Sequence, residues 1–241
     1  MNAAIITARG GKQALTDKHL REVCGAPLVA WPIRAAKNAE RIDSVYVSTN
    51  CPSIARVARG EGALVIDRPP ELALPTSDHG LAIRHAIEAV GSSRSDFENV
   101  VVLLGNTVMV DADLIDKALE MLEESSSLLL SGVMSVWQAQ DDHPMRALHV
   151  KDGYLKSYGD ASEEGISTNR QSYPDVYFYD QGVWAFRKRY AFSREGPRPW
   201  WWMGPKVRPI VREWIAGRDV HSVFGLDVSE WWLARQQRGA Q

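Results

Sequence analysis

Short apolar runs that alternate with helical patterns constrain the fold of this chain more than any other feature. The runs lie at residues 3–8, 44–49, 63–66, 99–105 and 127–136. Several are apolar throughout, which is typical of parallel strands that are covered by helices on both faces. The segments between them carry apolar residues at helical spacing, at 27–39, 51–62, 80–91 and 111–125. This β-α-β-α order predicts a doubly wound, mostly parallel sheet that binds ligands beyond the carboxyl ends of its strands.

The second half of the chain has a different pattern. Asp152-Gly153 is a favoured two-residue turn, and its β-prone flanks predict a hairpin. We expect one domain over residues 1–241, with a small β-rich lobe inserted at 137–180. The stretch RPWWWMGPK at 198–206 is expected to be a hydrophobic anchor or a subunit contact, not a platform for stacking bases.

The bulk charge of the chain excludes several classes of function. Its 241 residues carry a formal net charge of −2 at pH 7, which gives no global field to attract nucleic acid or an anionic membrane surface.

The apolar run at 3–8 is too short for the core of a signal peptide or for a membrane span, so we expect a cytoplasmic protein. Cys24 and Cys51 have neither metal-type nor redox-type spacing, which is typical of reduced structural thiols.

The first predicted strand runs into an Arg-Gly-Gly turn, from Arg9 to Gly11, and then into a loop that contains Lys12 and Lys18. Glycine lets the backbone approach anionic oxygens, and arginine supplies a planar set of donors. The order of strand, glycine turn and basic loop predicts a place that holds phosphates. The alternative is a tight turn whose basic residues are solvated.

Further stretches of the chain follow this turn in a specific order. They read ARGGKQALTDKH at 8–19, LREVCGAPLVAWPIRAA at 20–36, VVLLGNT at 101–107, NRQSYPDVYFYDQGVWAF at 169–186 and VFGLDVSEWWLA at 223–234. In this order they resemble the acylneuraminate cytidylyltransferase family, the enzymes that make CMP-activated sialic acids and related 2-keto sugar acids. The resemblance implies a GT-A-like, mononucleotide-binding nucleotidyltransferase domain whose small lobe serves homodimerisation. It also implies Mg²⁺-dependent transfer of CMP from CTP to the anomeric hydroxyl of an acidic sugar, with release of pyrophosphate.

The resemblance also implies roles for individual residues. The implied nucleotide site consists of Ala8, Arg9, Gly10, Gly11, Lys12, Lys18, His19 and Arg68. The implied acceptor contacts are Gly105, Asn106, Thr107, Arg170, Gln171 and Gln181. The implied catalytic residues are Arg9, Lys18 and Asp227. Asp227 is also the carboxylate that would serve Mg²⁺, and Arg170 would meet the carboxylate of the acceptor.

Some of these residues have structural alternatives. His19 can be a surface residue. Arg68 can instead form a surface ion pair with Asp67 or Glu71. Asp227 can cap the helix expected after it. The polar residues that follow Arg68 are open candidates for the same pocket: Thr76, Ser77 and His79.

The chain departs from the family pattern at positions that matter for chemistry. Lys12-Gln13 stands where the family has Ser-Lys, and Gly225 replaces the first acid of an Asp-Ile-Asp motif. Gly105-Asn106 stands where the family has Gln-Pro, so the chain lacks the glutamine side-chain amide that would contact the sugar acid. We therefore expect an acceptor that differs from N-acetylneuraminic acid in at least one substituent. Two alternatives stay open: a nucleotidyltransferase with another nucleotide or a non-sialic acidic acceptor, and a catalytically silent nucleotide-binding paralogue.

Overall fold

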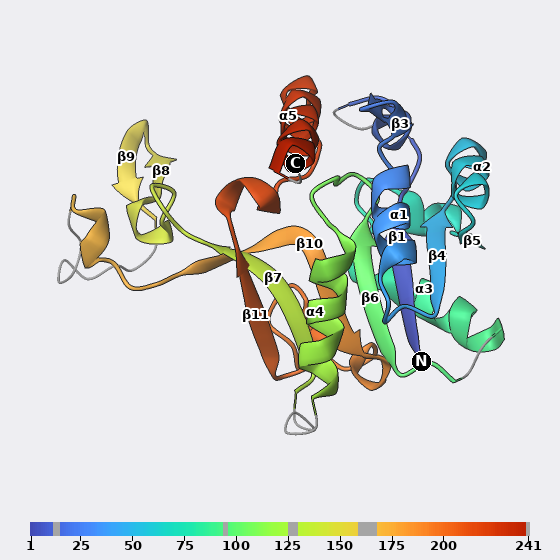
Figure 1. Cartoon of the computed structure of the whole chain (residues 1–241). Helices are drawn as coiled ribbons and strands as arrows, with labels where there is room; N and C mark the ends of the chain where they lie inside the picture. The colour runs from blue at the N-terminus through green and yellow to red at the C-terminus, as the bar shows by residue number, and fades with distance from the viewer. Residues whose placement is uncertain (12–14, 94–95, 125–129, 159–167, 240–241) are drawn as a thin grey trace.

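The structure of this chain, a computed structural model, describes residues 1–11, 15–93, 96–124, 130–158 and 168–239 (Figure 1). Its main sheet has seven strands in the order β11-β7-β10-β6-β1-β4-β5. These strands are β1 (Asn2–Thr7), β4 (Ser44–Thr49), β5 (Leu64–Asp67), β6 (Asn99–Leu104), β7 (Gly132–Gln138), β10 (Tyr177–Arg187) and β11 (Val207–Arg212). β10 runs antiparallel to both of its neighbours, and the other neighbouring strands run parallel. The predicted doubly wound, mostly parallel sheet is confirmed.

Helices cover both faces of this sheet. They are α1 (Ala30–Asn38), α2 (Pro52–Gly60), α3 (His79–Ser93), α4 (Ala112–Glu123) and α5 (Val223–Gly239). Ala4 and Ile6 of β1 pack with α1, α2 and α4, whereas Ala3 and Ile5 pack with α3 on the other face. Both faces of β1 are therefore buried, which is why the strand is apolar throughout.

Smaller elements complete the fold. Two short hairpins are formed by β2 (Glu22–Val23) with β3 (Ala26–Pro27) and by β8 (Leu148–Lys151) with β9 (Tyr154–Ser157). The 3-10 helices are η1 (Lys18–Leu20), η2 (Pro70–Ala73), η4 (Pro144–Arg146), η5 (Arg170–Ser172), η6 (Lys188–Tyr190), η7 (Trp201–Met203) and η8 (Trp214–Gly217). Figure 1 shows the β8–β9 hairpin standing away from the main sheet, and α5 near the end of the sheet opposite the N-terminus. No helix in the described ranges has the length and apolar character needed to cross a membrane.

The hairpin turn predicted at Asp152-Gly153 is confirmed, and the start of α4 is a second local feature that the sequence explains. Asp111 caps α4, because its side chain accepts a hydrogen bond from Leu114 N at 2.9 Å. The turn between β8 and β9 has positive φ at both central residues, 54° at Asp152 and 81° at Gly153. Positive φ at both positions is the backbone that a tight hairpin turn requires.

Two other elements differ from the sequence-based expectations. β11 is not predicted, because Pro209 lies within it and proline lacks the N–H that a central strand needs. β11 lies at the edge of the sheet beside β7, where a missing donor is tolerated. α5 begins at Val223, so Asp227 lies within the helix and does not cap it.

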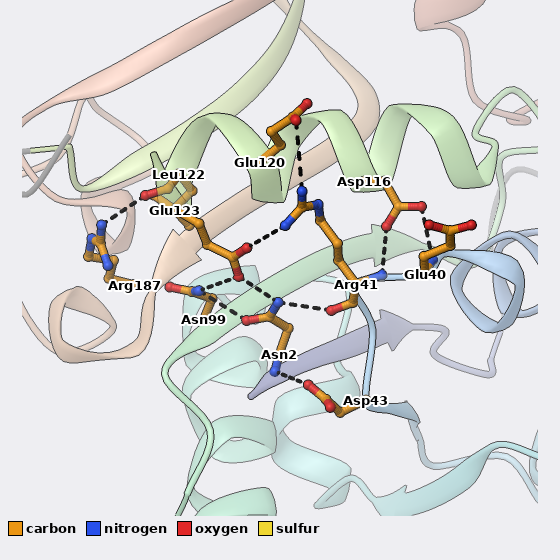
Figure 2. Close-up of polar contacts among 10 residues, drawn as sticks. All are labelled: Asn2, Glu40, Arg41, Asp43, Asn99, Asp116, Glu120, Leu122, Glu123 and Arg187. Atoms are coloured by element: carbon orange, nitrogen blue, oxygen red, sulfur yellow. Dashed lines mark hydrogen bonds and ion pairs between the residues drawn. The ribbon is translucent and has the colours of Figure 1, made fainter. Parts of the chain in front are cut away.

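A polar cluster closes the amino-terminal end of the sheet (Figure 2). Asn2 in β1 and Asn99 in β6 are buried, and their side-chain amides donate to Glu123 Oε1 at 2.8 and 3.4 Å. Asn99 also donates to Asn2 Oδ1 at 3.0 Å. Arg41 donates to Glu123 Oε2 at 2.9 Å. Glu123 therefore ties the end of α4 to two parallel strands and to the α1–β4 connection.

Replacing Glu123 with alanine is expected to lower the free energy of unfolding by about 2 kcal/mol, because two buried amides lose an acceptor. Urea denaturation measures the change. Glu120→Ala is the matched control, since Glu120 also pairs with Arg41 from α4, but at 3.7 Å and with 61% of its side chain exposed. That variant is expected to change the free energy by less than about 0.5 kcal/mol. Equal effects would contradict the structural role of Glu123.

Candidate active site

A cavity of about 750 Å³ opens at the carboxyl ends of the parallel strands. Thr7 at the end of β1, Leu104 at the end of β6 and Arg68 directly after β5 all line it. A doubly wound sheet offers this position to ligands. The lining side chains include a cationic wall, an aromatic wall and several polar residues.

The cationic wall consists of Arg9, Lys18 and Arg68. Burial lowers the pKa of Lys18, the Asp219 carboxylate opposes this effect, and the charge of Arg9 adds to it. Burial and then the charge of Arg9 lower the pKa of Arg68 to about 10. Cations that repel one another in a buried cavity are stabilised by a polyanion, so this wall suits a triphosphate.

Backbone and hydroxyl groups hold both arginines in place. Arg68 Nε donates to Ser48 Oγ at 3.1 Å, and its Nη2 donates to the Ser48 carbonyl at 2.9 Å. Arg9 Nη1 donates to the Ala73 carbonyl at 3.1 Å. Because Arg68 is buried, the alternative of a surface ion pair is wrong.

Two histidines line the cavity as neutral groups. His79 Nε2 lies 2.9 Å from Thr7 Oγ1. Burial and then the charge of Arg68 lower the pKa of His79 to about 4. Burial and then the charges of Lys18 and Arg68 lower the pKa of His19 to about 3, and His19 is buried, not a surface residue. At neutral pH both imidazoles therefore offer hydrogen bonds without charge, and His79 is the candidate after Arg68 that lines this cavity.

Asp219 brings a carboxylate into the cavity near Lys18. Its Oδ2 accepts a hydrogen bond from Asn106 Nδ2 at 2.7 Å and lies 2.9 Å from His221 Nε2. Burial raises the pKa of this carboxyl, but the contacts with His221 and Asn106 and the charge of Lys18 outweigh burial and lower the pKa below its usual value. A carboxylate that stays ionised in a cavity open to ligands suits a hard divalent cation.

Large rings form the aromatic wall, which consists of Tyr179, Trp184, Trp200 and Trp202. The first two come from β10, and the other two come from the segment at η7. The apolar stretch at 198–206, predicted to be a hydrophobic anchor or a subunit contact, therefore supplies part of the cavity.

The Arg-Gly-Gly turn beside the cavity needs both of its glycines. A Cβ at Gly10 would lie 2.7 Å from the Cβ of Cys51, and Gly11 has a φ of 103°. Gly10 N donates to Asn50 Oδ1 at 2.8 Å, which fixes the turn against the end of β4. Ala8 is buried beneath the turn. The contact of these residues with phosphates stays a prediction.

The three predicted acceptor residues at the end of β6 have different surroundings. Asn106 lines the cavity, and its amide donates to Asp219 at 2.7 Å and to a backbone carbonyl at 3.1 Å. Thr107 is buried, and its hydroxyl accepts from a backbone N–H at 3.2 Å. A Cβ at Gly105 would lie 2.7 Å from the Cβ of Ala8. A glutamine at this position would therefore not fit without a backbone shift.

The remaining predicted residues lie in different places. Gln181 on β10 lines the cavity next to the aromatic wall. Gln171 on η5 and Asp227 on α5 are exposed, and neither lines this cavity. The Arg170 side chain and the whole of Lys12 lie outside the described part of the chain. The roles predicted for these residues stay predictions.

Sequence reasoning misses several residues of the cavity. Tyr179 lies two positions before Gln181, so strand alternation could have found it. Trp184 breaks that alternation, because the register of β10 against β7 shifts between Tyr179 and Trp184. Asp219 and His221 stand in a segment without any motif, and no pattern in the sequence marks them.

Comparison with known proteins gives matches over much of the chain. A family model described as cytidylyltransferase matches residues 3–195. N-acylneuraminate cytidylyltransferase from Oncorhynchus mykiss is 41% identical over 75 residues, which are 31% of this chain and 17% of that protein. Pseudaminic acid cytidylyltransferase from Campylobacter jejuni is 27% identical over 130 residues, which are 54% of this chain and 56% of that protein. The matched region is thus only part of the length of either relative.

A solved structure matches the chain from end to end. The structure of CMP:2-keto-3-deoxy-manno-octonic acid synthetase complexed with CTP has a TM-score of 0.69 and 14% sequence identity. The match covers 98% of this chain and 99% of that chain. At this level of identity the likeness shows a shared fold.

Proposed function

The chain belongs to the cytidylyltransferase family, and on that premise we propose that it is a CMP-sugar acid synthetase. In this reaction CMP passes from CTP to the anomeric hydroxyl of a sialic-acid-like 2-keto-3-deoxy sugar acid, and pyrophosphate leaves. The observation that carries the proposal is the cationic wall of Arg9, Lys18 and Arg68 at the ligand-binding end of the sheet. The cavity of about 750 Å³ is large enough to hold a second substrate beside the nucleotide.

The cavity residues supply the physical requirements of nucleotidyl transfer. Arg9 and Lys18 bind phosphate oxygens and stabilise the charge that grows on the departing pyrophosphate. Neutral His19 and His79 orient the ribose or the base through hydrogen bonds without adding charge. Buried walls keep the acceptor hydroxyl in line with the α-phosphorus, which removes much of the entropic barrier to reaction.

Mg²⁺ is part of this proposal. Among the described residues no group of three or more His, Cys, Asp or Glu side chains could hold a metal, so the protein offers no cage. Mg²⁺ usually binds through substrate phosphates and waters with one or two carboxylates. Asp219 fits this pattern, because it lies in the cavity with the phosphate-binding cations. Bound Mg²⁺ would neutralise charge on the triphosphate.

Pyrophosphate release tests the proposed function. The assay pairs each common nucleoside triphosphate with a panel of eight- and nine-carbon 2-keto-3-deoxy acids. Release is expected with CTP and at least one of these acids. Release with another triphosphate alone would indicate a different nucleotidyltransferase. CTP binding in calorimetry without release from any acid would indicate a catalytically silent paralogue.

We further propose that the chain forms a homodimer through the β8–β9 hairpin, which lies inside the predicted lobe. Val150 and Leu155 are cross-strand neighbours on this hairpin, with 70% and 68% of their surfaces exposed. Leu148 lies on the same face of the hairpin and is exposed as well. A two-stranded hairpin is marginally stable alone, and a continuous exposed apolar surface is typical of an interaction site. The family resemblance indicates a second copy of the chain as the partner.

Replacing Leu155 with aspartate is expected to convert the dimer to a monomer, because the interface would have to bury an unpaired charge. Light scattering at micromolar concentration measures the mass. Lys151→Asp is the control, since Lys151 is an exposed polar residue of the same hairpin, and this variant is expected to stay dimeric. A monomeric wild-type protein, or a dimeric Leu155→Asp variant, would refute the proposal.

A further inference from the structure

A buried ion pair stands next to the cavity, and the proposed function does not use it. Asp180 on β10 has no exposed surface, and its Oδ2 pairs with Arg212 Nη1 of β11 at 3.0 Å. The Arg212 side chain is only 12% exposed. Apolar residues of similar volume often stabilise a fold as well as a buried ion pair does, because both charges lose their hydration. Stability alone therefore does not explain why the pair is there.

Asp180 holds a bulge of β10 in one shape. The register of β10 against β7 shifts between Tyr179 and Trp184. Asp180 Oδ1 accepts from Gly182 N at 2.8 Å and from Ser135 Oγ on β7. The Trp184 indole N–H donates to the Asp180 carbonyl at 3.1 Å. One buried residue thus bonds to the backbone of the bulge, to a side chain that follows it and to the neighbouring strand.

The bulge sets the direction of two cavity side chains. Tyr179 and Gln181 stand on either side of Asp180 in the chain, and both line the cavity. Neighbours in an extended chain point to opposite sides, so Asp180 points away from the cavity while they point into it. Gly182 leaves the space for the ion pair, because a Cβ there would overlap Arg212 Nη1. The position of Asp180 therefore decides where Tyr179 and Gln181 lie.

Arg212 ties a second cavity segment to this bulge. Its Nη2 donates to the Met109 carbonyl in the loop after β6. In the same loop Met109 N donates to Thr107 Oγ1 at 3.2 Å. Asn106 of this loop lines the cavity and donates to Asp219 at 2.7 Å. The planar guanidinium meets a carboxylate and a carbonyl at once, which the point charge of a lysine does not do in the same geometry.

We propose that the Asp180–Arg212 pair positions two cavity segments, 179–181 and 105–109, relative to each other for binding of the acidic acceptor. This inference rests on the proposed function and adds two positioning residues to it. Neither residue lines the cavity, so both act through the side chains that do. β10 lies on the other side of β6 from β1, so the pair acts on the part of the cavity away from the cationic wall.

Arg212→Met tests the proposal, because it keeps an unbranched side chain but removes the contacts with Asp180 and Met109. It is expected to raise KM for the acid at least about tenfold and to keep CTP affinity within about threefold of the wild type. The acid is the eight- or nine-carbon 2-keto-3-deoxy acid that gives the fastest wild-type release of pyrophosphate, and calorimetry measures CTP affinity. Arg208→Met is the matched control. Arg208 is an exposed arginine of the same strand, and wild-type values are expected.

A double variant separates positioning from stability. Arg212→Met alone leaves Asp180 as an unpaired buried charge, which lowers the melting temperature. Adding Asp180→Asn removes that charge and keeps an oxygen that can accept from Gly182 N. The melting temperature is expected to recover toward the wild-type value while KM for the acid stays raised, since the bond to Met109 is still missing. Recovery of both values together would overturn the inference.

Amide hydrogen exchange tests the link without any substrate. In the double variant we expect faster exchange in both segments, 105–110 and 178–184, and unchanged exchange in β1 and β4. Faster exchange confined to β10 and β11 would overturn the inference, and so would a loss of CTP affinity as large as the rise in KM. If the wild type releases no pyrophosphate with any acid, the proposed function fails, while exchange still decides whether the pair couples the two segments.

Discussion

Replacing Arg9 with alanine is expected to weaken CTP binding by at least about 100-fold. Hydrogen bonds to charged groups contribute about 1.5–3 kcal/mol each, and Arg9 can form two of them with phosphate oxygens. Because about 1.4 kcal/mol is a factor of ten in affinity, the loss of both corresponds to about two orders of magnitude or more. Isothermal titration calorimetry with CTP and Mg²⁺ measures the affinity directly.

Arg9 is a better probe of the cationic wall than Arg68. Arg68 is buried and bonded to Ser48, so its removal would disturb folding as well as binding. Arg9 is partly exposed on the loop that follows β1. Arg56→Ala on α2 is the matched control, since Arg56 is an exposed arginine outside the cavity, and wild-type affinity is expected. An Arg9→Ala variant that binds CTP as tightly as the wild type would remove the cationic wall from the binding site.

The parallel core of the fold is predictable because a strand that is buried on both faces is apolar throughout. Ala3 to Ile6 are apolar without interruption, since alternate residues pack under α3 and under the helices of the other face. β11 has no such apolar run. It has one neighbour in the sheet, its residues are mostly exposed or partly exposed, and Pro209 argues against a strand.

The cationic wall of the candidate site is predictable for a similar local reason. Arg9 and Arg68 follow strand ends directly, and parallel strands bring their carboxyl ends to one edge of the sheet. The cavity position of Lys18 also follows from its place in the loop after β1, because that loop crosses the same edge. Motif and fold therefore point to the same residues.

The rest of the cavity depends on contacts between distant segments, which a local pattern does not encode. Asp219 reaches the cavity because Val220 N bonds to the Asn106 carbonyl at 2.8 Å, which docks its segment onto the end of β6. Trp200 and Trp202 reach it through the packing of η7 against α3 and β10. The acceptor contact of Gly105 stays a prediction, and the structure adds that its missing side chain leaves room for Ala8.

The carboxylate proposed to bind Mg²⁺ gives the sharpest comparison between sequence and structure. The family pattern indicates Asp227, which lies on α5 outside the cavity, whereas the geometry favours Asp219 inside it. Both can be changed to asparagine with little change in shape. At position 219 the asparagine can still accept the hydrogen bond from Asn106 through its carbonyl oxygen.

Asp219→Asn is expected to lower kcat by about 100-fold or more with a smaller effect on CTP affinity, because charge stabilisation by a positioned cation is needed most as pyrophosphate leaves. Asp227→Asn is expected to stay within about twofold of the wild type, since exposed surface substitutions rarely disturb a site they do not touch. Pyrophosphate release measured across a Mg²⁺ titration separates the two, because only a variant that has lost a metal contact should need more Mg²⁺ for half-maximal rate. If Asp227→Asn shows the loss and Asp219→Asn does not, the motif identifies the metal ligand, and α5 must then move toward the cavity when CTP and Mg²⁺ bind.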